Sequence, residues 1–331
     1  MMVNVAINGF GRIGRQILQA GINDPDIKWV AINDLTDTKT LAYLLKYDSV
    51  QRRETRDVAA SPDSIVVNGK KILVFAEKDP EKLPWKNLGI DVVIESSGFF
   101  TEKDGAMKHI KAGAKKVLIS APSKSADLSI VRGVNEHMLK KEHTIVSNCS
   151  CTTNCAAPMT KVLNDNFGIE KAFMVTSHAY TATQRLVDAP DAKDPRRGRS
   201  AAINMVPSTT GAAEAVVQTI PELKGKLDGF AIRVPVPSGS IITLIALVKK
   251  PATKENINWL FNQVAQHHMK GVLEYTEEPL VSTDIIHNSH SCILDAALTK
   301  VTDGNLVSVT GWYDNEWGYS CRMVDVVKLM G

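Results

Sequence analysis

The chain has 331 residues, of which 44% are hydrophobic and 23% are charged, enough for one large domain or two ordinary domains with well-buried cores. Its formal net charge of +3 is too small to imply a polyanionic partner such as nucleic acid, although small anionic substrates stay possible. The five cysteines are an odd and low number. We see no secretory signal and no apolar run near the roughly 20 residues of a membrane span. We therefore expect a cytoplasmic protein with reduced thiols.

The first half of the chain alternates short apolar runs with polar segments of helical period. This alternation is typical of βαβ units and predicts a parallel sheet. Between these units, residues 64–75 contain two strand-like runs about Asn68 and Gly69, which predicts an inserted hairpin. The predicted parallel strands are residues 3–7, 29–33, 91–95, 116–120 and 144–148.

A glycine turn follows the first predicted strand. Gly9, Gly11 and Gly14 stand in the order GxGxxG before a helix, where glycines allow a tight turn and a pyrophosphate can approach the helix N-terminus. Asp34 ends the second predicted strand, where its carboxylate can accept hydrogen bonds from a ribose diol. Asp34 would repel a 2′-phosphate and Leu35 offers no cation for one, so NAD is favoured over NADP. A glycine turn without a ligand is the alternative interpretation.

After residue 150 the pattern changes to longer alternating runs and amphipathic stretches. This predicts a mixed, largely antiparallel sheet with helices on one side. The overall expectation is an α/β protein with an N-terminal Rossmann dinucleotide-binding domain over residues 1–150, joined by a C-terminal helix at 316–331, and an α+β catalytic domain over 151–315. The predicted strands of the second part are 229–237, 240–250 and 306–313, and the predicted helices lie near 211–220 and 253–267.

Three of the five cysteines fall within the sequence SNCSCTTNC, at Cys149, Cys151 and Cys155. No second cysteine pair or nearby histidine completes a tetrahedral zinc site, so a metal is poorly supported. Residues 151–167 read as a helix, and Cys151 would lie in its first turn, where the helix dipole favours a thiolate. We expect Cys155 to face into packing and Cys149 to be a small buried residue. Three structural thiols are the alternative.

Six segments occur in the order and at the separations found in glyceraldehyde-3-phosphate dehydrogenases, and the chain resembles that family over essentially its whole length. The resemblance implies a glycolytic homotetramer that converts glyceraldehyde 3-phosphate and inorganic phosphate to 1,3-bisphosphoglycerate with reduction of NAD, through a cysteine hemithioacetal and a thioester. The six segments are NGFGRIGR, SNCSCTTNCAAP, SHAYTATQ, STTGAAEAV, RVPVP and WYDNEWGYS.

The resemblance also implies roles for single residues. Cys151 is the expected nucleophile, and His178 is expected to stabilise its thiolate and to take a proton as hydride leaves. Thr181 and Arg233 are expected at the substrate phosphate. The expected site of inorganic phosphate comprises Ser150, Thr152, Arg197, Thr210 and Gly211, with the choice among Arg196, Arg197 and Arg199 left open. The expected cofactor contacts are Gly9, Gly11, Arg12, Ile13, Gly14, Asp34, Lys78, Ser120 and Asn315, the last on the carboxamide.

Several positions depart from the family pattern, among them Ala156 in place of the usual leucine and the segment 49–57. Cys149 replaces the usual alanine, Glu214 replaces the usual lysine and brings negative charge near the expected phosphate site, and Thr243 stands where aspartate is common. Two other functions stay open, an erythrose-4-phosphate dehydrogenase and a catalytically idle NAD-binding regulator on the same fold. The segments HAYT and STTGAA favour the triose enzyme, and the presence of both Cys151 and His178 argues against an idle protein.

Overall fold

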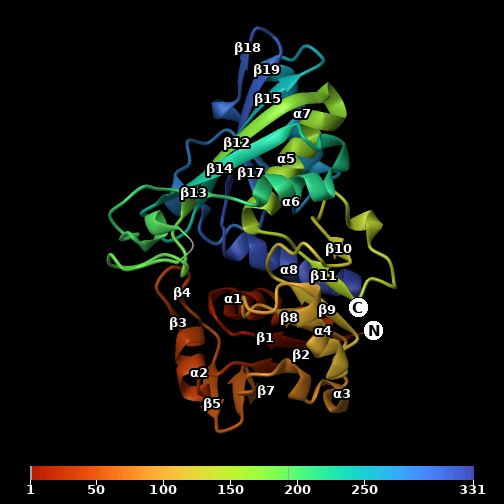
Figure 1. Cartoon of the computed structure of the whole chain (residues 1–331), viewed down its shortest axis with the longest axis vertical. Helices are drawn as coiled ribbons and strands as arrows, with labels where there is room; N and C mark the ends of the chain where they lie inside the picture. Colours follow the sequence, from red (N-terminus) through yellow and green to blue (C-terminus); the bar gives the residue numbers. More distant parts are fainter. Residues whose placement is uncertain (1, 193) are drawn as a thin grey trace. The chain divides into compact units, whose positions relative to one another are not determined.

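The computed structural model describes residues 2–192 and 194–331 (Figure 1). The chain divides into two compact units, each with its own sheet. The first unit contains the residues up to Ile130, His137–Cys149 and Ser320–Gly331, and the second contains Val131–Glu136 and Ser150–Tyr319. The chain therefore leaves the first unit and returns to it at its C-terminal end.

The first unit is built on a nine-stranded sheet in the order β10-β11-β9-β8-β1-β2-β7-β6-β5. Strands from β10 to β7 pair in parallel, whereas β7, β6 and β5 pair antiparallel. The five strands predicted from alternating apolar runs are confirmed as β1, β2, β8, β9 and β11. The bounds are β1 Val3–Asn8, β2 Ile27–Asn33, β5 Val58–Ser61, β6 Ser64–Val67, β7 Lys70–Phe75, β8 Val92–Glu95, β9 Lys116–Ile119, β10 Leu128–Ser129 and β11 Ile145–Ser147.

The predicted hairpin is confirmed as β6 and β7, which pair directly across a two-residue turn. Asn68 has φ of 46° and Gly69 has φ of 77°. Left-handed backbone at both turn positions matches the twist of the two strands, and asparagine and glycine adopt it at least cost. A second, smaller ribbon pairs β3, Tyr47–Asp48, with β4, Arg52–Arg53.

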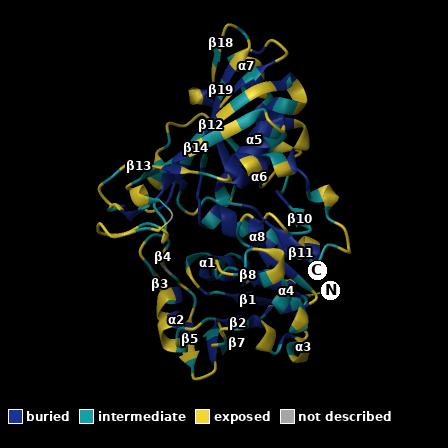
Figure 2. Ribbon diagram, viewed as in Figure 1, coloured by how far each residue is buried: buried dark blue, intermediate teal, exposed yellow. Residues whose placement is uncertain are grey.

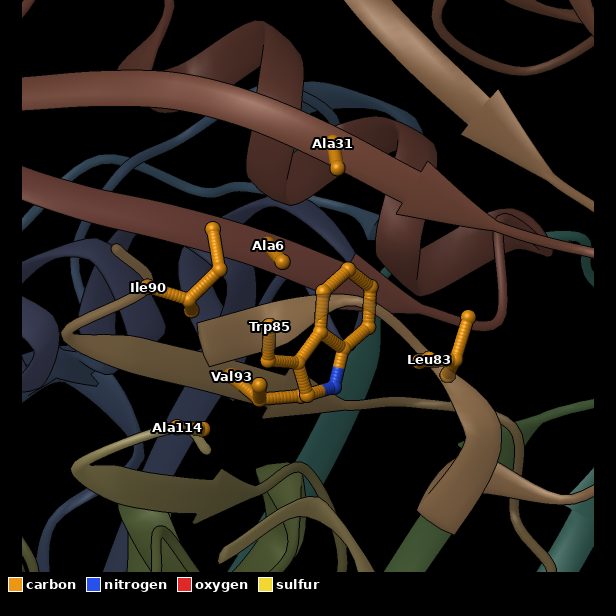
Figure 3. Packing of buried hydrophobic residues seen from close by; sticks show 7 residues of the cluster. All are labelled: Ala6, Ala31, Leu83, Trp85, Ile90, Val93 and Ala114. Carbon is orange, nitrogen blue, oxygen red and sulfur yellow. The ribbon is translucent and has the colours of Figure 1, made fainter. Parts of the chain in front are cut away.

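Helices and apolar side chains pack the first sheet. Trp85 begins α3 and is fully buried, and Figure 3 shows its ring among small and branched side chains from three neighbouring strands and loops. Its nearest partners in that cluster are Ala6, Ala31, Leu83, Ile90, Val93 and Ala114. Truncating an aromatic ring of this kind typically costs about 3–5 kcal/mol of folding free energy. The helices are α1 Arg12–Gly21, α2 Thr38–Lys46, α3 Trp85–Leu88, α4 Lys103–Lys111 and α8 Trp317–Met330.

The second unit contains a mixed sheet in the order β13-β14-β12-β15-β19-β17-β16, with β18 paired to β19. Its pairs are antiparallel except β12 with β14 and β16 with β17, so the predicted fold class is confirmed. The bounds are β12 Ile169–Ala179, β13 Val206–Thr209, β14 Leu227–Val234, β15 Ser240–Val248, β16 Leu273–Thr276, β17 Cys292–Asp295, β18 Lys300–Thr302 and β19 Leu306–Tyr313.

Helix α5, Cys151–Phe167, packs against β15, β17 and β19. It is the helix predicted after the cysteine cluster, and α6, Ala212–Thr219, and α7, Lys254–Gln266, confirm the other two predicted helices. Buried and exposed residues succeed one another along β12 (Figure 2), so one side of this sheet carries the core and the other does not. Short 3-10 helices occur at Pro80–Lys82, Glu136–Met138, Pro195–Gly198, Pro221–Leu223, Ser282–Ile285 and Ala296–Leu298.

None of the five cysteines forms a disulfide. Within residues 2–192 and 194–331, no helix combines the length and apolar character that crossing a bilayer requires. The same residues contain no group of three or more histidine, cysteine, aspartate or glutamate side chains placed to hold a metal ion.

Candidate active site

Cys151 is the first residue of α5, and the residue before it caps that helix. The Ser150 hydroxyl accepts a hydrogen bond from the Thr153 N–H at 3.0 Å, which satisfies one of the unpaired donors of the first turn. Cys151 keeps part of its surface exposed, whereas Cys149 and Cys155 are buried. Accessibility therefore distinguishes Cys151 from the other two thiols.

Cys149, two residues earlier, has φ of 56°, a left-handed conformation that is uncommon for any residue other than glycine. Its N–H donates to the Ser147 hydroxyl at 3.1 Å. Burial raises the pKa of the Cys149 thiol to about 12, so it stays protonated and weakly nucleophilic at neutral pH. This agrees with its predicted role as a small buried residue.

His178 lies beside the thiol of Cys151, with its Nε2 3.4 Å from Sγ. The pairing of β12 with β14 sets His178 directly opposite Arg233, and the Arg233 Nη1 lies 2.7 Å from His178 Nδ1 and 3.1 Å from the Ala179 carbonyl oxygen. A guanidinium can only donate, so Nδ1 accepts from Arg233 when the imidazole hydrogen sits on Nε2 and faces the sulfur. Nδ1 also lies 2.6 Å from the Ala179 carbonyl oxygen, to which it donates when the hydrogen sits on Nδ1.

Burial dominates the charge state of this pair. It lowers the pKa of His178 to about 3, with a smaller contribution from the neighbouring Arg233 charge. Burial also raises the pKa of Cys151, and the Arg233 charge opposes that rise. These pKa directions favour a thiol and a neutral imidazole, because the cost of burying a charge opposes the effect of the helix dipole on Cys151.

Tyr313, at the end of β19, supports both members of the pair. Its hydroxyl lies 2.9 Å from Thr176 Oγ1 and 3.1 Å from Thr152 Oγ1, and its ring meets the His178 ring edge to face at 5.9 Å. Burial raises the pKa of Tyr313, so the phenol is neutral. The Thr152 hydroxyl is therefore engaged inside the protein, unlike the phosphate contact expected of it. Sequence reasoning missed Thr176 and Tyr313, because nothing in the local pattern shows that they meet.

The structure separates the three candidate arginines. The Nε and Nη2 of Arg197 lie 2.9 and 2.7 Å from the Ser208 hydroxyl, next to the end of β13. Arg199 instead pairs with Asp188, with Nε 2.8 Å from a carboxylate oxygen, and the Arg196 side chain is exposed. Of the three, Arg197 is thus the one directed at the predicted phosphate region.

That region continues into the N-terminus of α6. Gly211 is the N-cap residue, and the Thr210 hydroxyl accepts the Ala212 N–H at 3.2 Å. Glu214 is exposed in the first turn of the helix. Thr181, half-exposed, lies with its hydroxyl 2.9 Å from Thr183. Hydroxyls, helix N–H groups and a guanidinium are suitable partners for a tetrahedral anion.

A pocket of about 650 Å³ opens on the first unit, over the glycine turn. Gly9 has φ of 90°, and a Cβ there would lie 2.5 Å from the Ser97 backbone, while a Cβ on Gly14 would lie 2.2 Å from the Gly9 carbonyl oxygen. A Cβ on Gly11 would meet nothing within 4 Å. Gly9 and Gly14 are therefore required by the protein itself, and Gly11 leaves open space for a ligand.

Asp34 fixes one side of this pocket. One of its carboxylate oxygens accepts the Phe10 N–H at 2.8 Å, and the other accepts the Thr36 N–H at 3.0 Å. Leu35 beside it is 61% exposed and carries no charge. The glycine turn, the helix N-terminus and this carboxylate together fit the pyrophosphate and ribose of a dinucleotide.

The other predicted cofactor residues differ in their locations and partners. Lys78 lines the pocket with Gly9, Gly11 and Asp34, whereas Arg12 pairs with Asp48 at 3.1 Å. Gly14 and Ile13 lie in α1, Ser120 follows β9, and Asn315 belongs to the second unit. Lining residues that sequence reasoning missed are Asn8, Asn33, Leu35, Glu77, Ser96, Ser97, Phe99 and Phe100. Several end the central strands, and position in a βαβ unit could have indicated them.

A hydrogen-bond network, defined here as the floor network, joins the ends of these strands. The register places Asn8 between Asn33 and Glu95. Asn8 Nδ2 donates to Glu95 at 2.6 Å, and Asn33 Nδ2 donates to Asn8 Oδ1 at 2.7 Å. Behind them, the Trp85 indole donates to His109 Nδ1 at 3.0 Å, and His109 Nε2 lies 3.1 Å from Glu95. Because an indole only donates, Nδ1 of His109 accepts and Nε2 carries the proton.

Two family models match the chain. Residues 3–103 match the NAD binding domain of glyceraldehyde 3-phosphate dehydrogenase, and residues 150–315 match the C-terminal domain. The chain belongs to the glyceraldehyde-3-phosphate dehydrogenase family. Membership of that family makes it an NAD-dependent dehydrogenase, so the predicted family, enzyme class and cofactor are confirmed.

Full-length relatives agree with this assignment. The chain is 52% identical over 327 residues to a glyceraldehyde-3-phosphate dehydrogenase of Geobacillus stearothermophilus, covering 98% of the chain and 97% of the relative. It is 51% identical over 333 residues to glyceraldehyde-3-phosphate dehydrogenase 2 of Streptomyces avermitilis, covering 100% and 99%. It is 52% identical over 338 residues to the glyceraldehyde-3-phosphate dehydrogenase of Mycobacterium avium, covering 100% and 99%.

Proposed function

We propose that the chain oxidises glyceraldehyde 3-phosphate and joins the product to inorganic phosphate, giving 1,3-bisphosphoglycerate. The observation that carries this proposal is the approach of Cys151 Sγ to His178 Nε2 at 3.4 Å, at the N-terminus of a capped helix. The names of the relatives support the substrate. The predicted NAD-binding domain, residues 1–150 with 316–331, and the predicted catalytic domain, residues 151–315, would correspond to the two compact units, whose own limits lie at 149/150 and 319/320 with Val131–Glu136 in the second unit.

In this reaction the sulfur of Cys151 attacks the aldehyde carbon and the thiol proton passes to the aldehyde oxygen, which forms a hemithioacetal. His178 then takes the hemithioacetal hydroxyl proton while C1 loses a hydride, leaving a thioester. Bound NAD supplies the hydride acceptor. Inorganic phosphate attacks the thioester carbonyl, the C–S bond breaks, and Cys151 leaves as a thiolate.

Arg233 links anion binding to the state of His178. Its guanidinium contacts Nδ1 of His178, which favours the tautomer with the imidazole hydrogen on Nε2. A substrate phosphate that draws Arg233 away allows Nδ1 to carry the hydrogen and donate to the Ala179 carbonyl, 2.6 Å distant. Nε2 then has a free lone pair and can act as the base.

The phosphate contacts are part of the proposal. Arg233 and Thr181 would bind the substrate phosphate. Burial lowers the pKa of Arg233, and the nearby charge of Arg197 also lowers it. Two cations therefore lie near one another where an anion would bind. Ser150, Thr152, Arg197, Thr210 and Gly211 would surround inorganic phosphate. For Thr152 this contact would come from its backbone N–H.

We also propose that the chain forms the predicted homotetramer. On the side of the second sheet opposite α5, Phe173, Phe230 and Ile245 are 40%, 39% and 40% exposed, and the two phenylalanine rings lie 5.9 Å apart. A sheet face with adjoining exposed apolar side chains favours burial against a copy of itself. The predicted cytoplasmic location stays a prediction.

The deciding experiment mixes the protein with NAD, glyceraldehyde 3-phosphate and inorganic phosphate and follows NADH absorbance. Cys151→Ser should abolish the signal, because a hydroxyl at this position is a poor nucleophile, whereas Cys149→Ser should largely retain it. Equal loss in both variants would mean that the nucleophile is misassigned. Preference for erythrose 4-phosphate over the triose would favour the tetrose enzyme, and NAD binding without turnover of either sugar would favour an idle regulator.

A further inference from the structure

The amide of Asn315 is held from one side. Asn315 follows β19 and is 4% exposed, and its Oδ1 accepts a hydrogen bond from the Ser240 hydroxyl at 2.8 Å. Ser238 Oγ is farther away, at 3.4 Å, and lies closer to a carboxylate oxygen of Asp314, at 2.9 Å. A serine has one proton, and that of Ser238 goes to Asp314. Ser240 is therefore the principal partner of the amide oxygen.

The surroundings of Ser240 favour this direction. It begins β15 and is fully buried, and its Oγ accepts the Ala179 N–H at 3.0 Å. A second lone pair of Oγ could accept an amide N–H of Asn315, but the Ser240 proton would then lose the amide oxygen, its acceptor at 2.8 Å, and a buried donor without an acceptor is costly. We therefore expect Asn315 to present its oxygen to Ser240. Because the oxygen and nitrogen of an amide share one carbon, fixing the oxygen directs Nδ2 away from Ser240.

The backbone around Asn315 is fixed separately by Asp314. One carboxylate oxygen of Asp314 accepts the N–H groups of Glu316 and Trp317, both at 2.9 Å, and the other accepts the His287 N–H at 2.7 Å. These bonds hold the turn in which Asn315 lies. The remaining freedom is rotation of the Asn315 side chain, which exchanges its two amide ends, and Ser240 is placed to remove it.

We propose that Ser240 is a positioning residue that decides which end of the Asn315 amide faces the cofactor. It makes Nδ2 the offered group, a donor for the carbonyl oxygen of the nicotinamide carboxamide. This inference rests on the proposed function and on the contact between Asn315 and the nicotinamide carboxamide that the family resemblance predicts. It follows that the site selects a ring substituent with a strong hydrogen-bond acceptor and is indifferent to whether that substituent carries an amide N–H2 group.

Binding of three dinucleotides tests this orientation, with dissociation constants measured by quenching of tryptophan fluorescence. The thionicotinamide analogue of NAD replaces the acceptor oxygen by sulfur, and the 3-acetylpyridine analogue keeps the oxygen but lacks the N–H2 group. The wild-type protein should bind the acetyl analogue about as tightly as NAD and the thio analogue roughly 2- to 10-fold more weakly. In Ser240→Ala the amide presents either end, so the affinities of the two analogues should converge.

Matched variants distinguish a change in the orientation of the Asn315 amide from a general disturbance of the structure. Ser238→Ala should keep the wild-type order of affinities, since the proton of Ser238 serves Asp314. In an Asn315→Ala background, adding Ser240→Ala should change none of the three constants, because Ser240 acts through Asn315. If Ser240→Ala unfolds, Ser240→Cys keeps a group of similar size with a weaker donor and should give partial convergence.

Three outcomes would overturn the inference, and they are distinguishable. If NAD binds and Ser240→Ala keeps the wild-type order of affinities, the positioning role is wrong while the proposed function stands. A wild-type protein that loses affinity for the acetyl analogue and not for the thio analogue would show the reverse orientation of Asn315. If the wild-type protein does not bind NAD, the proposed function fails and the inference fails with it.

Discussion

The chemistry of this protein depends on one charge close to two neutral groups. Arg233 lies against His178 and near Cys151, and its charge lowers the pKa of both side chains. For the thiol this favours the reactive thiolate, and for the imidazole it disfavours the imidazolium. Burial acts in the opposite direction on the thiol and prevails, so the resting site holds little thiolate.

This balance predicts the pH dependence of alkylation at Cys151. The rate of reaction with iodoacetamide should rise with pH through a transition above the ordinary thiol pKa, because only the thiolate reacts. Arg233→Ala should move the transition to higher pH and slow alkylation about 10-fold near neutral pH, the equivalent of one pKa unit. Arg199→Ala, which removes an exposed arginine paired with Asp188, should match the wild type. A wild-type transition below pH 7 would contradict the assignment.

At the scale of elements, strand register and helix caps place the reactive groups. The parallel pairing of β12 with β14 sets His178 opposite Arg233, and the Ser150 cap sets Cys151 at the start of α5. In the first unit, the strand-to-helix turn between β1 and α1 shapes the cofactor pocket through its glycines. Neither arrangement needs a long loop, so both sites are built on rigid parts of the fold.

The glycine turn gives a matched pair of substitutions. Gly14→Ala should lower the melting temperature strongly, because its Cβ would lie 2.2 Å from the backbone oxygen of Gly9. Gly11→Ala should leave the melting temperature nearly unchanged, since its Cβ enters open space, yet weaken NAD binding by blocking the pyrophosphate. Thermal unfolding and a binding titration measure the two effects. If Gly14→Ala and Gly11→Ala weakened NAD binding equally and neither lowered the melting temperature, these separate roles of the two glycines would be contradicted.

Much of this architecture could be predicted from local patterns. Alternating runs and turn residues indicated the parallel strands, the Asn68–Gly69 hairpin and α5. The strand β12 was not predicted, because charged and half-exposed residues interrupt its alternation, although it carries His178. The phenol of Tyr313 and the floor network were also missed, since their partners lie far apart in sequence and meet only through the sheet register. The nucleophile was predicted from position, but its protonation was not, because burial is a property of the folded chain.

At the scale of the whole molecule, each unit carries one large sheet and one set of candidate site residues. The second unit also leaves an apolar sheet face exposed, around Phe173, Phe230 and Ile245. An exposed face of this kind is costly in water unless it is covered. Thr243 lies on a strand of this sheet and pairs its hydroxyl with Thr310 at 3.0 Å, so the departure from the usual aspartate removes a charge there.

Assembly through this face can be tested by introducing one charged side chain. Phe230→Glu should reduce the mass measured by size-exclusion chromatography with light scattering, because a carboxylate would be buried without a partner. Trp259→Glu, at an apolar residue of α7 that is 64% exposed, is the control and should keep the wild-type mass. A Phe230→Glu protein of unchanged mass, or a monomeric wild type, would rule out this face as the contact.

The floor network bears on how the cofactor arrives. Glu95 and His109 are 1% and 0% exposed, and they form bonds within the protein to Asn8 and Trp85. The ring hydrogens of His109 and Trp85 should therefore exchange with heavy water as slowly as the most protected amides. A pocket whose polar lining is held by bonds within the protein loses little entropy when it is filled, so we expect NAD to bind without rearrangement beneath the glycine turn.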